Sequence, residues 1–174
     1  WATSAVVPDY AMKLIIGLVA LSFTARFYYN RYFAGNVQHP ARPHSIVRAG
    51  FWSTLSGYGS FVAHAGGAPF QVYGLPLKLP PRDYTGAAVR FFAILNAVKL
   101  VPYFMLGELD LKNLTLSATL FPLAPLATIA GAWMVRRMHP EFFYPFMYLM
   151  CALAGTKLTY DGLLPLLKAV SAIF

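Results

Sequence analysis

The residues best suited to chemistry in this sequence lie at a break within a long apolar stretch. Residues 47–79 are apolar enough to enter a membrane, yet His64-Ala65-Gly66-Gly67-Ala68-Pro69 interrupts them near the middle. A helix inside a membrane tolerates such a break only where the freed backbone groups face protein or a watery cavity. Transporters place substrate sites at breaks of this kind. The break therefore predicts both a membrane location and a binding site.

The residue types at the break suit an anion bound by backbone groups. Pro69 fits the first turn of a helix, where its missing N–H costs nothing. Gly66 and Gly67 lack Cβ atoms, so they permit unusual dihedral angles and close approach to the backbone. A helix starting near Ala68 would direct its free N–H groups at the break, and Gln71, within a turn of it, can line the same site. Alternatively, the glycine pair only makes a tight turn between packed helices.

His64 adds a titratable side chain to the break. A histidine inside a membrane usually faces a cavity or a partner. It can donate a hydrogen bond to an anion, or take up a proton that travels with the anion. The alternative is a neutral histidine bonded to a carbonyl that the break frees, and the sequence leaves both roles open.

A second polar face is predicted on a helix at residues 85–106. Asn96, Lys99 and Tyr103 are spaced by three and four residues, which places them on one helix face near the middle of the bilayer. A lysine at this depth is costly and seldom present without a role. We therefore expect Lys99 to complement an anion held at the break. Alternatively, its side chain extends outward past Tyr103 to the interface.

The composition indicates a membrane protein and excludes several other classes. Of 174 residues, 58% are hydrophobic and only 11% are charged, whereas about a quarter of a soluble domain is charged. The net charge of +8 comes from residues in short gaps between apolar runs, not from a basic helix face, so no nucleic-acid partner is expected. With one cysteine, Cys151, and no cluster of ligand types, no metal or cofactor is predicted. No nucleophile–base pair or carboxylate pair appears, so we do not expect an enzyme.

The apolar runs predict an all-α membrane protein in which residues 1–174 form a single membrane domain. Runs of about 20 residues are long enough to span a bilayer. About four transmembrane helices are expected, together with a broken helical hairpin at 47–79. The helices are predicted at 10–32, 85–106, 114–135 and 141–160, and the tail at 161–174 is predicted to lie at the interface.

The loop charges favour a hairpin that enters the membrane and returns to the same side. Basic residues gather in the gaps before and after 47–79 and in the gap at 136–140, whereas the gap at 107–113 carries Glu108 and Asp110. If 47–79 crossed the membrane completely, the basic gaps would fall on opposite sides. A re-entrant hairpin places all of them in the cytoplasm, as the positive-inside rule requires.

Four stretches of this sequence resemble the second half of the sulfite exporter TauE/SafE family. They read HAGGAPFQVYGLPLKLP from His64, RFFAILNAVKLVPYFMLGEL from Arg90, FPLAPLATIAGAW from Phe121 and AGTKLTYDGL from Ala154. The resemblance covers residues 10–165. Family members often have Gly-Thr at the start of the helix that corresponds to 85–106, where this chain has Gly86-Ala87. That difference leaves the identity of the substrate open.

The resemblance implies a secondary transporter for small oxyanions such as sulfite or organosulfonates. Such transporters combine two related halves in an inverted repeat, and we expect this chain to be one half. The expected partners are a small anion, the lipid bilayer, and a missing first half or other membrane subunits. The expected location is a bacterial inner membrane. The alternative is a transporter-derived structural or interaction subunit of a larger membrane complex.

Overall fold

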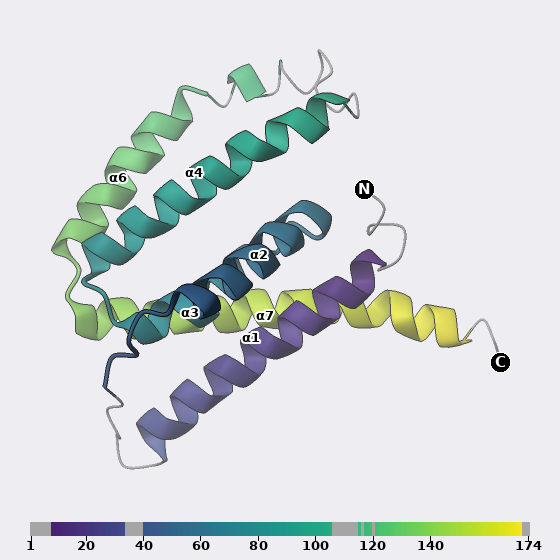
Figure 1. Cartoon of the computed structure of the whole chain (residues 1–174), viewed down its shortest axis with the longest axis horizontal. Coiled ribbons are helices and arrows are strands. Elements are labelled where there is room, and N and C mark those ends of the chain that lie inside the picture. Colours follow the sequence, from purple (N-terminus) through teal and green to yellow (C-terminus); the bar gives the residue numbers. More distant parts are fainter. Residues whose placement is uncertain (1–7, 34–39, 106–114, 116, 120, 172–174) are drawn as a thin grey trace. The chain divides into compact units, whose positions relative to one another are not determined.

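The computed structural model describes residues 8–33, 40–105, 115, 117–119 and 121–171, and every regular element within these ranges is helical. Most helices begin or end at residues with clear helix signals. Asp9 and Asp83 lie in first turns, where a negative charge favours the helix N-terminus, and Arg136 and Arg137 lie in a last turn. The elements are α1 (Asp9–Tyr32), α2 (Ile46–Val62), α3 (Gly67–Gly74), the 3₁₀ turn η1 (Leu75–Leu77), α4 (Pro81–Met105), α6 (Leu123–Arg137) and α7 (Pro140–Ser171) (Figure 1).

The chain forms two compact units. The first comprises Trp1–Lys78 and Tyr144–Phe174, and so contains α1, α2, α3, η1 and most of α7. The second comprises Leu79–Phe143 and contains α4 and α6. The broken segment belongs to the first unit and Lys99 to the second.

In the first unit, α1 and α7 pack antiparallel and very closely. A Cβ added to Gly17 would lie 2.5 Å from Thr159 Oγ1, and one added to Gly162 would lie 2.6 Å from Tyr10 O. At the other end of α1, the Tyr28 hydroxyl donates a hydrogen bond to Pro145 O (3.2 Å). Small residues at a helix contact let two backbones approach, so glycines fix the spacing of this pair.

The segment predicted at 47–79 folds back on itself as α2, a break, α3 and η1. The Tyr73 hydroxyl donates to Ser45 O (3.4 Å), and the Arg42 N–H donates to Pro76 O (2.9 Å). The end of the second limb therefore meets the start of the first, and the segment is a helical hairpin (Figure 1). Its re-entrant position in a membrane stays a prediction.

The second limb is shorter than the first, and two features complete its return. As a helix α2 is about 25 Å long, whereas α3 and η1 together reach about 18 Å. The 3₁₀ turn gains length because it rises further per residue than an α-helix. The remaining distance is covered by the residues that precede α2. Arg42 is one of them, and its N–H bonds directly to Pro76 O at the end of the second limb.

The core of the first unit surrounds the break. Three alanines around the break are buried with residues of α1 and with Cys151 of α7. The side chain of Ile16 reaches Gly59, where an added Cβ would lie 2.6 Å from Ile16 Cδ1. Helix α1 therefore covers the tip of the hairpin. The buried cluster is Met12, Ile16, Ala20, Ala63, Ala65, Ala68 and Cys151.

Helices α1 and α4 are the two helices in the described part of the chain that are long and apolar enough to cross a membrane. They contain 24 and 25 residues, and about 20 are needed. In α4, Ile94 and Phe104 are 67% and 75% exposed. Large exposed apolar surface marks contact with a membrane or another protein.

Helix α7 continues through residues predicted as a separate tail. The sequence predicted a helix at 141–160 and an interfacial tail from 161, whereas α7 runs from Pro140 to Ser171. The hydrogen bond between Lys157 and Asp161 (2.9 Å) spans the predicted boundary. Gly162 lies within the helix, and its missing side chain allows the close contact with α1. Residues 172–174 lie outside the described residues.

The helix predicted at 114–135 is interrupted. Residues 115 and 117–119 are helical, Phe121 and Pro122 form a turn, and α6 then runs from Leu123 to Arg137. Proline has no N–H to donate and disfavours the helical conformation of the residue before it. Pro122 therefore separates α6 from the preceding residues, and part of the predicted range lies outside the described residues.

The contact between α1 and α7 predicts how Gly17→Ala will behave. The added methyl group would lie 2.6 Å from Thr159 N and 2.9 Å from Gly155 O, and backbone atoms cannot move aside cheaply. We expect a loss of about 1–3 kcal/mol, the usual cost of overpacking, measured by thermal unfolding in detergent. Gly50→Ala is the control, because its added Cβ has no atom within 4 Å apart from its chain neighbours and the backbone of its own helix. Equal stability of the two variants would contradict this packing.

Candidate functional site

The first limb of the hairpin ends at a residue with a left-handed backbone. His64 has a φ angle of 53°, and the N–H groups of Ala63 and Ala65 both donate to Gly59 O (3.0 and 2.9 Å). Glycine or asparagine is the usual residue where a helix ends in this conformation. The sequence predicts that the glycines of the break permit unusual dihedral angles, whereas in the structure the positive φ angle falls on His64. Its side chain is exposed.

Position 66 needs a glycine because a side chain would not fit there, and not because of its backbone angles. Its φ and ψ angles of −65° and −22° are ordinary helical values. A Cβ there would lie 2.6 Å from Ser60 Cβ and 2.7 Å from Ser56 O. The buried Ser56 hydroxyl donates a hydrogen bond to Gly66 O (2.6 Å). The glycine therefore lets the break pack directly against the first limb.

Gly67 differs from its neighbour because it faces open space. It is the first residue of α3 and is exposed, and apart from its chain neighbours and the backbone of its own helix no atom lies within 4 Å of a Cβ added to it. The first N–H groups of a helix have no partner within that helix. In α3 the N–H of Phe70 reaches Gly66 O only at 3.4 Å. The start of α3 therefore offers backbone donors beside an open position.

Two further residues predicted at the break lie in the first turns of α3. Pro69 is buried at its third position, where it withholds no hydrogen bond from the helix. Gln71 is half-buried, and its Oε1 atom has no hydrogen-bond partner among the described residues. The structure therefore brings together His64, Gly66, Gly67, Pro69 and Gln71 as one local group.

On α4 the three predicted polar residues differ in exposure. Lys99 is only 9% exposed, whereas its neighbours Val98 and Leu100 are 64% and 56% exposed. Asn96 is exposed and Tyr103 is half-buried. Pro102 lies inside the helix and cannot donate to the carbonyl of Val98. Lys99 is thus a buried cation one turn from a weakened part of α4.

The predicted site joins residues of two units that are described separately. The break belongs to the first unit, and Asn96, Lys99 and Tyr103 belong to the second. A shared site stays a prediction. Among the described residues, no group of three or more histidine, cysteine or acidic side chains is placed to hold a metal.

Two serines of α2 pack against a residue of their own hairpin, which their spacing in the sequence does not predict. Ser56 and Ser60 are spaced by four residues, a pattern that predicts close packing of another helix. In the structure they contact Gly66 of their own hairpin. On α7, Lys157 and Asp161 are four residues apart and form a 2.9 Å ion pair, as is usual for opposite charges at this spacing on a helix.

Comparison with known proteins gives one match to a family. The model of the family described as Sulfite exporter TauE/SafE matches residues 1–158. Comparison with curated proteins and with solved structures gives no match. The matched range includes the whole hairpin and all of α4.

We expect alanine to destabilise the protein at Gly66 and to be tolerated at Gly67. Gly66→Ala places a methyl group against the Ser56 carbonyl and should lose about 1–3 kcal/mol of stability. Gly67→Ala points its methyl group into open space and should change stability by less than about 0.5 kcal/mol. Thermal unfolding in detergent, followed by circular dichroism, compares the pair. If both variants lose the same stability, the packing of Ser56 on Gly66 is wrong.

The positive φ angle of His64 predicts the relative stability of two variants at this position. Glycine adopts a positive φ without strain, whereas a left-handed conformation costs other residues about 1–2 kcal/mol and is worst for a β-branched side chain. We therefore expect His64→Gly to be at least as stable as the parent and His64→Val to be clearly less stable. The same unfolding assay applies. A valine variant as stable as the glycine variant would argue against the left-handed angle.

Proposed function

The chain belongs to the sulfite exporter TauE/SafE family, and on that premise we propose that it is a transporter, or half of one, for small oxyanions such as sulfite and organosulfonates. The family is one of membrane anion exporters and not of enzymes. The anion would be held between the start of α3 and the Asn96–Lys99 face of α4. A bacterial inner membrane is the proposed location.

The observation that carries this proposal is the open backbone at Gly67. Helix N-termini bind anions because their free N–H groups and the helix dipole favour negative charge. Broken helices supply such termini to substrates in several transporter folds. At Gly67 the start of α3 has space beside it, and Gln71 carries an unpartnered polar atom within one turn.

The burial of Lys99 supports the second half of the proposed site. The start of a helix is equivalent to about half a positive charge, which is too little to balance an oxyanion away from water. Lys99 supplies a full charge on α4, and it is buried where most of that helix is exposed. A cation at this depth is costly unless it serves an ion or a partner. Asn96 and Tyr103 would add neutral hydrogen-bond donors.

The exposed helices of the second unit favour one alternative. Leu126 and Ile129 of α6 are 65% and 67% exposed, as are comparable residues of α4. Surfaces of this kind fit lipid or further membrane subunits. The chain would then be a transporter-derived structural or interaction subunit and would bind no anion by itself.

Lys99→Met tests the site directly. Methionine keeps the length of the side chain and removes its charge, so binding of sulfite and of methanesulfonate should weaken by about 1–3 kcal/mol, the range for a lost charged hydrogen bond. Isothermal titration of the purified full chain at one pH measures this change. Lys157→Met is the control, because that side chain is 76% exposed and is paired with Asp161 of its own helix.

The outcomes separate the two functions. Unchanged binding in Lys99→Met would place the anion elsewhere while leaving the transporter intact. A parent chain that binds none of these anions would favour the subunit. Gly67→Val should weaken binding without loss of stability, because its side chain fills the open position beside α3.

A further inference from the structure

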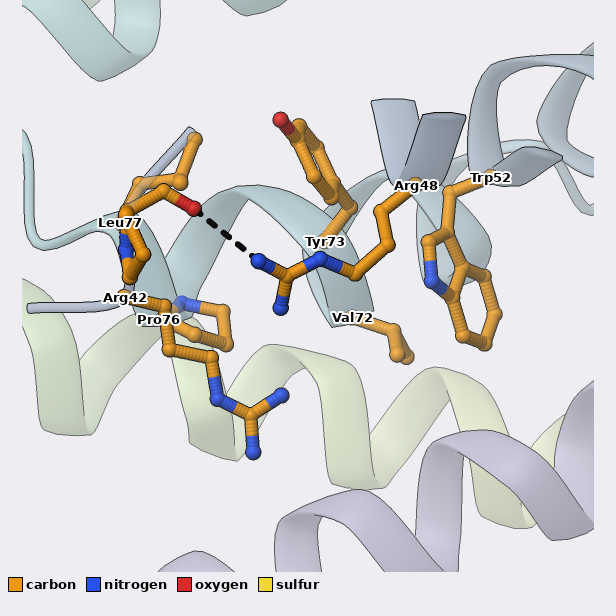
Figure 2. A pocket seen from close by; sticks show the side chains of 8 residues that line it. Arg42, Arg48, Trp52, Val72, Tyr73, Pro76 and Leu77 are labelled. Carbon is orange, nitrogen blue, oxygen red and sulfur yellow. Dashed lines mark hydrogen bonds between the residues drawn. The ribbon is translucent and has the colours of Figure 1, made fainter. Parts of the chain in front are cut away.

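A small pocket in the first unit lies away from the break. It is formed where the residues before α2 meet the end of α3 and η1, and its volume is about 30 Å³. In Figure 2 the side chain of Arg48 runs from the side of Trp52 past Tyr73, and its guanidinium lies toward Leu77. We call it the arginine pocket, and its lining residues are Arg42, Pro43, Arg48, Trp52, Val72, Tyr73, Pro76 and Leu77.

Two arginines give this pocket an uncompensated positive charge. Arg48 donates a hydrogen bond to Pro43 O (3.2 Å), which holds its guanidinium at the pocket (Figure 2). The described carboxylates of the first unit are Asp9 and Asp161, and each is bonded to a lysine of its own helix. Neither arginine is paired with a carboxylate among the described residues. The guanidinium group binds phosphate oxygens in pairs and is weakly hydrated, so it suits a phosphate.

The size of the pocket and its surroundings select the kind of phosphate. A volume of 30 Å³ holds about two water-sized groups, so most of any ligand must lie outside. On the first turn of α2, Ile46 and Val47 are 81% and 83% exposed. Acyl chains of a lipid can cover such side chains, whereas a soluble phosphate cannot. Trp52 adds an indole ring, which is typical of the membrane interface.

We propose that the arginine pocket binds the phosphate of an anionic lipid headgroup, with Arg42 and Arg48 as its ligands. The lipid's acyl chains lie along the exposed apolar turn of α2. The bound lipid would link the segment before α2 to the end of the second limb, which the Arg42 N–H to Pro76 O hydrogen bond already joins. The site is separate from the break and does not depend on the transported anion.

Trp52 lines the pocket and can report its occupant. In a background with Trp1→Phe and Trp133→Phe it is the single tryptophan. The chain is placed in phosphatidylcholine vesicles that contain a small fraction of dibrominated phosphatidylglycerol, and quenching is compared with that by dibrominated phosphatidylcholine. We expect phosphatidylglycerol to be preferred at Trp52 by about fivefold or more, since a basic residue at a membrane surface contributes about that factor.

The variants distinguish a specific site from general attraction to a charged surface. Arg42→Gln with Arg48→Gln should bring the preference close to one, whereas Arg136→Gln with Arg137→Gln, at the end of α6, should leave it unchanged. If the preference for phosphatidylglycerol fell equally in both double variants, the proposal would be overturned. If the glutamine pair does not fold, Arg42→Lys with Arg48→Lys replaces it. A lysine pair with the full preference would overturn the proposal, because ammonium groups cannot bind phosphate in a bidentate manner.

A competition arm separates the lipid from free phosphate. Inorganic phosphate and chloride are added at equal ionic strength. If both salts reduce the preference for phosphatidylglycerol only slightly and to a similar extent, the ligand is the lipid. If phosphate alone abolishes the preference, the pocket takes a soluble phosphate and the lipid proposal is overturned. Sulfite binding is measured separately, without added phosphate, on the parent and on Arg42→Gln with Arg48→Gln. It is expected to be the same in both, so failure here is distinct from failure of the transport proposal.

Discussion

The need to satisfy every backbone polar group away from water governs this structure. In hydrocarbon an unpaired N–H or C=O costs several kcal/mol, so each interruption of a helix has to be covered. Gly59 O accepts two N–H groups at the end of α2, and Ser56 donates to Gly66 O. Hydroxyls within the helices follow the same rule, because Thr24 and Thr128 bond to carbonyls four residues earlier.

The packing of α1 and α2 around the break also explains why the start of α3 is left open. The alanines of the break are packed under α1, and Gly66 is pressed against the serines of α2. At Gly67 the packing stops, and the start of α3 faces open space. The opening at Gly67, where we propose that the anion binds, therefore lies beside a closely packed part of the unit. Rigid support of this kind holds backbone donors in place without any charged side chain.

Positive charge is distributed over the chain in distinct settings. Lys13 and Lys157 are paired with aspartates on their own helices, where exposed pairs contribute little. Arg137 lies over the ring of Trp133 at 4.4 Å, a cation–π contact at the end of α6. Lys99 is buried on an otherwise exposed helix, and the two arginines of the arginine pocket line a small cavity. These last cations are the ones to which we assign anionic ligands.

The sequence by itself determined the class of protein, the family and the position of the break. Apolar runs and the scarcity of charge follow from contact with lipid and can be read without a structure, as can the proline and glycines at 66–69 and the Lys157–Asp161 pair. Tertiary structure decided the rest. The left-handed angle falls on His64, and Gly66 but not Gly67 is sterically required, because α2 packs against one and not the other. Helix α7 continues past residue 160, where Gly162 contacts α1. Arg42 and Arg48 share a pocket only because the hairpin returns to its start. Each of these depends on how the chain packs against itself, within the hairpin or between α1 and α7, which local sequence patterns do not encode.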